Sequence, residues 1–317
     1  MSRTGRGRGA AARVSPGLLY MAQGAFWFSV MSLLVKTAGR RLSSMEVVFV
    51  RGVVTLALSW LMLRRAGVRP WGAAAHRRML LMRGLLGSLA LLCFYFSLIH
   101  LPLADATVIQ YTNPVLATLL AAWLLRERAG WREVVAVAAG LAGVALVARP
   151  AWLFGAAAAG GGGAVPSVNP AHALVGLAGA LCSALAYVAI RQMGKAEHPL
   201  VVVFYFPLVT VPLALPLALP GWLWPTPAEW ATLAGIGVCT QLAQVSMTRG
   251  LQLEPAGRAT AVGYLQIVFA ALWGALAFGE RPSAWTVGGA AVILAGTLLV
   301  AVRGRGREAA ARAAELE

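Results

Sequence analysis

The sequence predicts an all-α integral membrane protein with ten transmembrane helices, arranged as two inverted repeats of five helices each. Three observations support this prediction. Hydrophobic residues make up 59% of the 317 residues and charged residues only 12%, about half the charged fraction of a soluble protein. Ten apolar runs are each long enough to cross the hydrocarbon core of a bilayer, which needs about 20 residues. The second half of the chain also repeats part of the first.

The apolar runs follow one another along almost the whole chain, so no segment remains for a separate soluble catalytic domain. They are too long for the strands of a membrane β-barrel and lack the alternation of such strands. Each run is therefore predicted to be a helix that crosses the membrane. The predicted spans are residues 17–35, 46–63, 79–99, 103–125, 131–149, 171–190, 199–219, 229–248, 256–278 and 284–302.

Positive charges are unevenly distributed over the segments that connect these spans. With the N-terminus in the cytoplasm, 21 Lys and Arg residues fall on the cytoplasmic side, 5 fall outside, and Arg51 lies within a span. Such a bias sets the orientation of membrane proteins. We expect a multi-pass protein of the cell inner (cytoplasmic) membrane with both termini cytoplasmic. The positive charges behind the net charge of +16 then orient the chain in the membrane and contact anionic lipid. No basic patch is left to bind nucleic acid.

The chain divides into two five-span units. Residues 150–170 lie between them, are rich in Gly and Ala and nearly uncharged, and are predicted to be a flexible external linker. The first repeat covers residues 17–149 and the second, inverted repeat residues 171–302. Residues 1–16 and 303–317 are the predicted cytoplasmic tails.

A shift of 153 residues relates the two halves. Residues 97–148 align with 250–301 without a gap, and 19 of the 52 positions are identical. Because each half has an odd number of spans, the second half must enter the membrane upside down. Secondary transporters built from such inverted repeats place the substrate near the midplane, between the repeats. The polar and aromatic matches include Pro102/Pro255, Tyr111/Tyr264 and Glu127/Glu280.

The repeated segments carry the pattern of a known family. In each half, a helix that ends in a Glu-Arg pair precedes a glycine-rich helix, as in LADATVIQYTNPVLATLLAAWLLRERAGWREVVAVAAGLAGVAL at 103–146 and GRATAVGYLQIVFAALWGALAFGERPSAWTVGGAAVILAGTLL at 257–299. Over residues 17–302 the chain resembles the EamA-domain family of the drug/metabolite transporter superfamily, in its ten-helix form. The stretches YLQIVFAALWG and RGLLG are most similar to the branch that contains S-adenosylmethionine uptake carriers. The resemblance implies a transporter of a small organic metabolite or drug-like solute.

Polar and aromatic residues near the middle of the spans are candidates for a substrate cavity, because polar groups at this depth face protein or a wet cavity. Hydrogen bonding between helices and simple packing are the alternatives, and both stay open. Pro114, in the middle of the fourth span, removes a backbone hydrogen bond and predicts a kink or hinge. The cavity candidates are Gln23, Trp27, Tyr95, Tyr111, Asn113, Tyr187, Gln241, Gln244, Tyr264 and Gln266.

Charged residues at span ends are the candidates for gates. Arg51 either attracts an anionic substrate group or snorkels to the interface. We expect Arg83, one turn inside the third span, to snorkel. Glu127 and Glu280 close the fourth and ninth spans on opposite faces of the membrane, either as gate groups or as charges that simply end a span. The histidines and cysteines form no metal-ligand set, so neither a metal nor a cofactor is predicted.

We predict a secondary transporter that works by alternating access around a midplane cavity. An integral-membrane enzyme and a non-transporting scaffold or channel are the alternatives. No span has a carboxylate near its centre, which disfavours an enzyme and favours an exchanger or facilitator over an ion-coupled symporter. Aromatic faces in the cavity predict a soft cation such as a sulfonium or, equally well, a neutral amphipathic solute. The predicted partners are this small molecule and the lipid bilayer, and both a monomer and a homodimer stay open.

Overall fold

Eight of the ten predicted spans are continuous helices in the structure, a computed structural model, and two are broken near the middle. The structure describes residues 15–38, 41–101, 103–127, 129–155, 169–279 and 283–301, and no strand occurs among them. The helices are α1 (Pro16–Ala38), α2 (Ser44–Arg65), α3 (Arg77–His100), α4 (Leu103–Gln110), α5 (Asn113–Leu124), α6 (Trp131–Ala148), α7 (Ala151–Phe154), α8 (Pro170–Met193), α9 (Pro199–Ala218), α10 (Pro227–Leu253), α11 (Ala256–Gly263), α12 (Leu265–Phe278) and α13 (Ala284–Ala301), with 3-10 turns η1 (Ala74–His76) and η2 (Gly194–Ala196).

Seven helical stretches among the described residues are long and apolar enough to cross a membrane. The other three predicted spans differ for physical reasons. The fourth is divided into α4 and α5, α13 is a shorter apolar helix, and α10 carries three glutamines within its 27 residues. The predicted fold class is thus confirmed. The division into repeats, linker and tails stays a prediction, and residues 1–14, 156–168 and 302–317 lie outside the described residues.

Several helices begin where the sequence supplies a capping side chain. The Ser43 hydroxyl accepts a hydrogen bond from the backbone N–H of Glu46, and Asn169 caps α8 in the same way. Thr226 and Glu229 form a reciprocal capping box at the start of α10. Such side chains satisfy N–H groups that have no partner within the helix. Local sequence therefore sets the starts of α2, α8 and α10.

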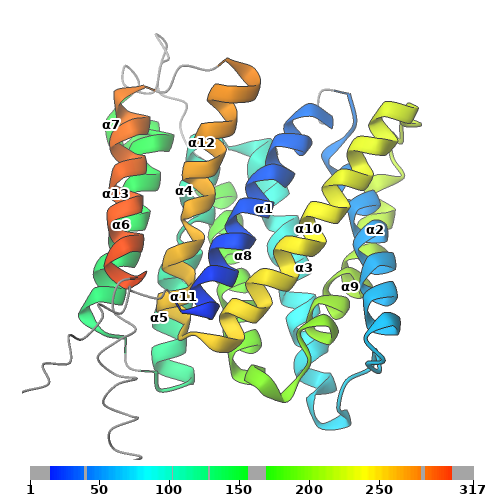
Figure 1. The fold of residues 1–317 in the computed structure, drawn as a ribbon. Coiled ribbons are helices and arrows are strands. Elements are labelled where there is room, and N and C mark those ends of the chain that lie inside the picture. The colour runs from blue at the N-terminus through cyan, green and yellow to red at the C-terminus, as the bar shows by residue number, and fades with distance from the viewer. Residues whose placement is uncertain are drawn as a thin grey trace, which may run out of the picture.

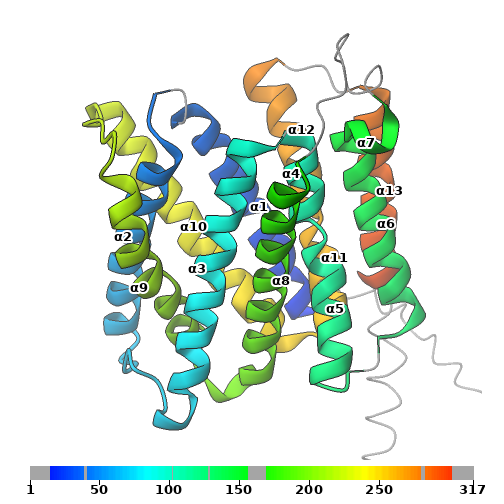
Figure 2. The same cartoon turned by 180° about the vertical axis from the view of Figure 1, so that it is seen from behind.

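The helices run side by side, and the broken helices lie between the pair α6 and α13 and the pair α1 and α8 (Figures 1 and 2). Helices α6 and α13 form one edge, and α2 and α9 lie at the opposite edge. Between these edges, α1 packs along α10 and α3 packs along α8. Helices α1 to α6 correspond to α8 to α13 in the two predicted repeats. With this correspondence, the contact of α1 with α10 is equivalent to that of α8 with α3. The contacts of α2 with α9 and of α6 with α13 are each equivalent to themselves. This is the pattern expected of two repeats related by a pseudo-two-fold axis.

Glycines allow α6 and α13 to approach closely. A Cβ atom added at Gly143 would lie 2.7 Å from the carbonyl oxygen of Gly289, and one added at Gly289 would lie 2.6 Å from that of Gly143. Small residues at such crossings let two helix backbones touch within a membrane. The two repeats are thus joined at this edge by backbone contact.

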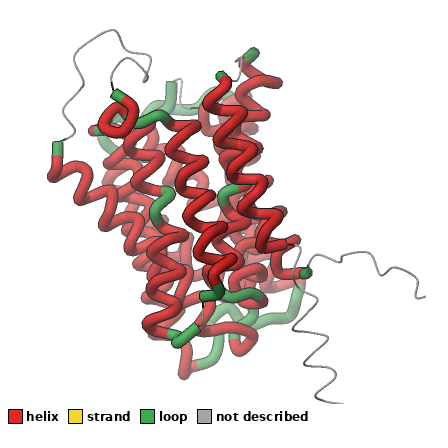
Figure 3. The backbone as a smooth tube through the Cα atoms, turned by 90° about the vertical axis from the view of Figure 1, so that its left-hand side faces the viewer, coloured by secondary structure: helices red, strands yellow, loops and turns green. Residues whose placement is uncertain are grey.

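Both repeats have a break in the corresponding helix, visible as short interruptions at mid-height in Figure 3. In the first repeat, Tyr111 and Thr112 separate α4 from α5, and Pro114 follows at the start of α5. Proline has no N–H for the i−4 carbonyl, which explains the break that the sequence predicts. In the second repeat, Tyr264 alone separates α11 from α12. The breaks lie at mid-height in the bundle, and polar side chains flank them.

Candidate functional site

A cavity of about 260 Å³ lies between the two repeats. Its walls come from α1 to α5 of the first repeat and from α8 to α12 of the second, so both broken helices contribute. Apolar residues make up more than half of the walls, and polar and charged residues make up the rest. The polar and charged residues that line it are Arg51, Arg83, Tyr95, Gln110, Tyr111, Asn113, Ser183, Tyr187, Gln244, Thr260 and Gln266.

Six of the ten cavity candidates lie around this one space. The two breaks contribute equivalent positions, because Asn113 and Gln266 are related by the 153-residue shift and both line the cavity. The Asn113 side-chain amide donates to the Ser183 hydroxyl at 3.2 Å, which links α5 to α8. Their role in binding a solute stays a prediction. The six residues are Tyr95, Tyr111, Asn113, Tyr187, Gln244 and Gln266.

Gln23 and Trp27 do not line the cavity, although they lie at the expected depth. Gln23 is exposed and accepts a hydrogen bond from Ser246 at 3.2 Å. The Trp27 ring packs edge to face on the neighbouring Phe26, with ring centroids 5.3 Å apart. The cavity side of α1 is instead the stripe Met21, Gly24, Ala25, Phe28 and Met31. In a helix, residues 23 and 27 project to the side of that stripe.

Gln241 and Tyr264 also lie away from the cavity, and both connect helices. The side-chain oxygen of Gln241 accepts from the Ser59 hydroxyl at 3.0 Å, which ties α10 to α2. Tyr264 is fully buried, and its hydroxyl donates to the backbone carbonyl of Tyr111 at 3.0 Å. These two residues form hydrogen bonds between helices, which was the alternative to lining the cavity.

The three gate candidates have different environments. Arg51 is buried and lines the cavity. Glu127 forms an ion pair with Arg191 of α8, with 2.5 Å between Oε1 and Nε, and accepts from the backbone N–H of Ala256 at 3.0 Å. Glu127 therefore bridges the first repeat to two helices of the second. Glu280 lies outside the described residues.

Arg83 is the main residue whose place the sequence did not predict. The expectation that it snorkels to the interface is wrong, because its side chain is buried and lines the cavity. It donates to the Gln244 side-chain oxygen at 3.2 Å, and its guanidinium lies over the Phe206 ring, 5.1 Å from the centroid. Its position only six residues into α3 suggested an interface residue. Gln110, at the end of α4, was also missed, although its place beside Tyr111 was a usable signal.

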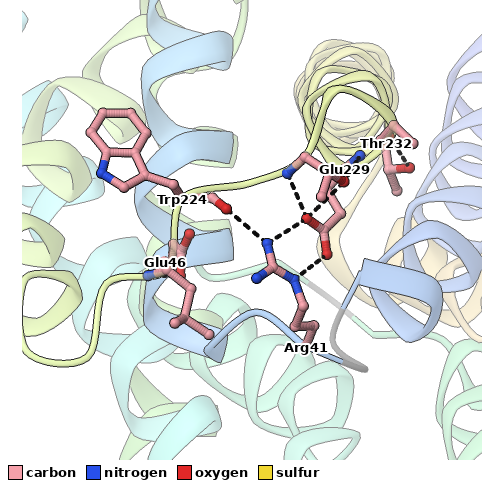
Figure 4. Close-up of polar contacts among 8 residues, drawn as sticks. Arg41, Glu46, Trp224, Glu229 and Thr232 are labelled. Carbon is pink, nitrogen blue, oxygen red and sulfur yellow. Dashed lines mark hydrogen bonds and ion pairs between the residues drawn. The ribbon is translucent and has the colours of Figure 1, made fainter.

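A second ion pair joins the repeats at the other end of the bundle (Figure 4). Arg41, in the connection between α1 and α2, reaches the first turn of α10. Its guanidinium donates to both carboxylate oxygens of Glu229, at 2.8 and 2.7 Å, and to the carbonyl of Trp224 at 2.7 Å. Ion pairs between the repeats thus occur at both ends of the bundle. Among the described residues, no group of three or more His, Cys, Asp or Glu side chains is placed to hold a metal.

Comparison with known proteins identifies the family. The model of the EamA-like transporter family matches residues 15–149 and 171–302. The chain belongs to the EamA-like transporter family. A solved crystal structure superposes on it with a TM-score of 0.79, over 92% of this chain and 99% of that chain, at 21% identity. At this identity, the likeness shows the fold alone.

Two curated relatives carry transporter names. The chain is 35% identical to the pseudopaline exporter CntI of Pseudomonas aeruginosa over 286 residues, which covers 88% of this chain and 93% of the exporter. It is 30% identical to solute carrier family 35 member G1 of Homo sapiens, over 90% of this chain and 79% of that protein. The predicted family is therefore confirmed, and the chain is a multi-pass membrane transporter. The resemblance to the S-adenosylmethionine branch stays a prediction.

Proposed function

We propose that this chain is a secondary transporter that moves a small organic solute across the cytoplasmic membrane by alternating access. The cavity between the two repeats carries this proposal, because equivalent positions of both broken helices line it. An inverted repeat can open to either side by exchanging the conformations of its halves. The ion pairs Glu127–Arg191 and Arg41–Glu229 connect the repeats at the two ends. Each would open when its end of the cavity opens.

Export is the proposed direction, because the relative at 35% identity is named an exporter. We further propose an exchanger or facilitator rather than an ion-coupled symporter. None of the described residues that line the cavity is acidic, whereas ion-coupled carriers often have a carboxylate deep in the membrane. We also propose that both termini lie in the cytoplasm, because of the distribution of positive charge.

Counterflow in proteoliposomes tests the carrier mechanism. Solutes that raise the melting temperature of the purified protein identify ligands, since a ligand of the folded state stabilises it. Liposomes are then loaded with excess unlabelled ligand and given labelled ligand outside. A carrier accumulates the label transiently by exchange, whereas a channel or scaffold gives only passive equilibration or no uptake. Equal uptake by loaded and empty liposomes would exclude a carrier.

Cysteine labelling tests the topology. With Cys93, Cys182 and Cys239 replaced, one cysteine is introduced between residues 156 and 168 and, in a second variant, at Ala66 between α2 and α3. In intact cells, a membrane-impermeant reagent should label the first variant and not the second. The opposite result would reverse the proposed orientation.

A further inference from the structure

The cavity contains two buried arginines that have no acidic partner among the described residues. Arg51 of α2 is 6% exposed and Arg83 of α3 is 2% exposed, and both line the same space. Neither belongs to an ion pair in the part of the chain that the structure describes. Arginine stays protonated in proteins. Two positive charges are therefore held where an uncompensated charge is costly.

The polar groups of these arginines are only partly satisfied. The nearest polar contact of Arg51 is the weak acceptor Met31, with 3.9 Å between Nη1 and the sulfur. Arg83 has one hydrogen bond, to Gln244, and its Nε is buried without a partner among the described residues. Because a guanidinium has five N–H donors, most of the donor capacity of both residues remains for a ligand.

The protein leaves space for the Arg83 guanidinium rather than neutralising it. A Cβ atom added at Gly87 would lie 2.5 Å from Nη1 of Arg83 and 2.9 Å from the Phe206 ring. The glycine on the next turn of α3 thus allows the guanidinium to lie over this ring. The Arg83 cation is therefore held in place by packing against this ring at the cavity wall.

The acidic side chains that the structure describes lie away from the cavity. None of them lines the cavity. Glu46 is on the same helix as Arg51, but its Oε2 accepts from the backbone N–H of Leu223 at 3.4 Å. The remaining ion-paired acids have partners away from the cavity, namely Glu127 with Arg191, Glu197 with His76, Glu229 with Arg41 and Glu254 with Arg258. Among the acidic residues whose side chains the structure describes, none complements the two arginines inside the cavity, which leaves that role to a ligand.

The two arginines enter the cavity at different levels. Arg51 lies seven residues after the start of α2 and Arg83 six residues after the start of α3. At 1.5 Å per residue, each is about 10 Å from its end of the bundle. Since α2 and α3 are consecutive antiparallel spans, these are opposite ends. The two arginines therefore start from different levels of the bundle, which two separated anionic groups match better than one.

We propose that the transported solute is an organic anion with two separated carboxylates, bound by Arg51 at one end and Arg83 at the other. The inference rests on the proposed transport function and defines its substrate class. Phe28, Phe94 and Phe206 offer apolar contact for the carbon body between the carboxylates. The expectation of a soft cation, drawn from the aromatic residues alone, disregards these two positive charges, which would repel it.

Thermal shift measurements on the detergent-purified protein test the substrate class. The probes are aliphatic dicarboxylates from succinate to suberate, each compared with the diol and the diamine of the same length. At least one dicarboxylate at millimolar concentration should raise the melting temperature by several degrees, and its diol and diamine should not. The shift should be lost in Arg51→Gln and Arg83→Gln and kept in Arg65→Gln, an exposed arginine on the same helix as Arg51. Stabilisation by diamines or diols alone, or by no dicarboxylate, would overturn the proposal.

The melting temperature without ligand separates a binding role from a structural one. If Arg83 serves mainly to bind anions, Arg83→Met should fold at least as stably as the parent protein, because the variant buries no uncompensated charge. If Arg83 only supports the bundle through Gln244 and Phe206, the variant should melt several degrees lower and keep the dicarboxylate shift. This second result would overturn the assignment.

Two further measurements distinguish a soluble dicarboxylate from a lipid headgroup, and binding from transport. Phosphatidylglycerol supplies an anionic lipid headgroup, so a shift from this lipid with none from dicarboxylates would contradict a soluble substrate. Counterflow of the stabilising dicarboxylate tests transport itself. Arginine-dependent binding without counterflow would refute the carrier mechanism and leave the anion site in place. Counterflow of a cation or neutral solute that no dicarboxylate inhibits would refute the anion site alone.

Discussion

The hydroxyl of Tyr264 donates a hydrogen bond to the backbone carbonyl of Tyr111, its own equivalent in the other repeat, at 3.0 Å. The two rings stack with centroids 5.9 Å apart. The 153-residue shift relates the two positions, yet only Tyr111 lines the cavity, and Tyr264 is buried behind it. A side chain of one break thus satisfies a backbone group of the other. We conclude that this contact fixes the two broken helices against each other.

Tyr264→Phe should lower the stability of the protein while leaving its shape unchanged. The variant loses the hydroxyl and leaves the Tyr111 carbonyl without this partner, a cost of about 1 kcal/mol. A melting temperature lower by a few degrees in detergent would show it. Tyr111→Phe is the control, because no described contact uses the Tyr111 hydroxyl as donor or acceptor, so its melting temperature should stay near that of the parent. An equal loss in both variants would contradict a specific role for the Tyr264 hydroxyl.

Gly140→Ala should lower the stability of the protein more than Tyr264→Phe does. A Cβ atom at this position would lie 2.2 Å from Cδ2 of Tyr264, a ring that packs against Val144 and Ile293. Forcing a methyl group into such a core costs about 1–3 kcal/mol. The matched control is Gly288→Ala, also in a helix of this edge, where nothing lies within 4 Å. The control should be neutral or stabilising, because alanine favours a helix more than glycine does, and a comparable loss there would show that the clash with Tyr264 is not the cause.

The sequence predicts how far along its span a residue lies better than which direction the residue faces. Depth follows from the position of a residue within an apolar run. Direction depends on which neighbours a helix packs against, and the weak amphipathicity of membrane helices gives little information about it. Trp27 and Phe28 illustrate this limit, because both lie near the middle of α1 and only Phe28 lines the cavity. Arg83 shows the same limit for a charged residue.

The two helix breaks differ in how well the sequence predicts them. Pro114 made the first break predictable from local chemistry alone. The equivalent position in the second repeat is Ile267, so the sequence carries no such signal, and the predicted ninth span was continuous. The break at Tyr264 accompanies a contact with Tyr111 across the bundle. Such a contact can be seen only after the two repeats are packed together.

Glu127→Gln should loosen the end of the bundle where Glu127 lies. The variant keeps a hydrogen-bonding side chain of the same size but loses the charge that pairs with Arg191, a cost of about 1–2 kcal/mol. If this end must open during transport, a single cysteine at the cavity residue Thr260 should react faster from the cytoplasmic side in inside-out vesicles. The control is Glu133→Gln, which changes a carboxylate that belongs to none of the described ion pairs. Unchanged labelling in Glu127→Gln would mean that Glu127 only ends its helix.

His198 should make stability depend on pH near neutrality. It precedes α9, and its Nδ1 accepts a hydrogen bond from the backbone N–H of Leu200 at 3.3 Å. Burial, and then the positive charge of Arg249, lower the pKa of His198 below its ordinary value of 6.5. The folded protein therefore favours the neutral ring, which can accept at Nδ1, whereas the unfolded chain binds the proton more readily.

This contribution to stability is complete above pH 6.5 and is lost as the pH falls through the lowered pKa of the folded state. The parent protein should therefore lose more melting temperature between about pH 8 and pH 5 than His198→Asn does. Asparagine has no titration in this range and keeps a side-chain acceptor suited to the start of a helix. Because His198 is largely exposed, the difference should be small, so the two proteins must be compared in the same buffers. Parallel melting curves at every pH would show that protonation of His198 is not linked to folding.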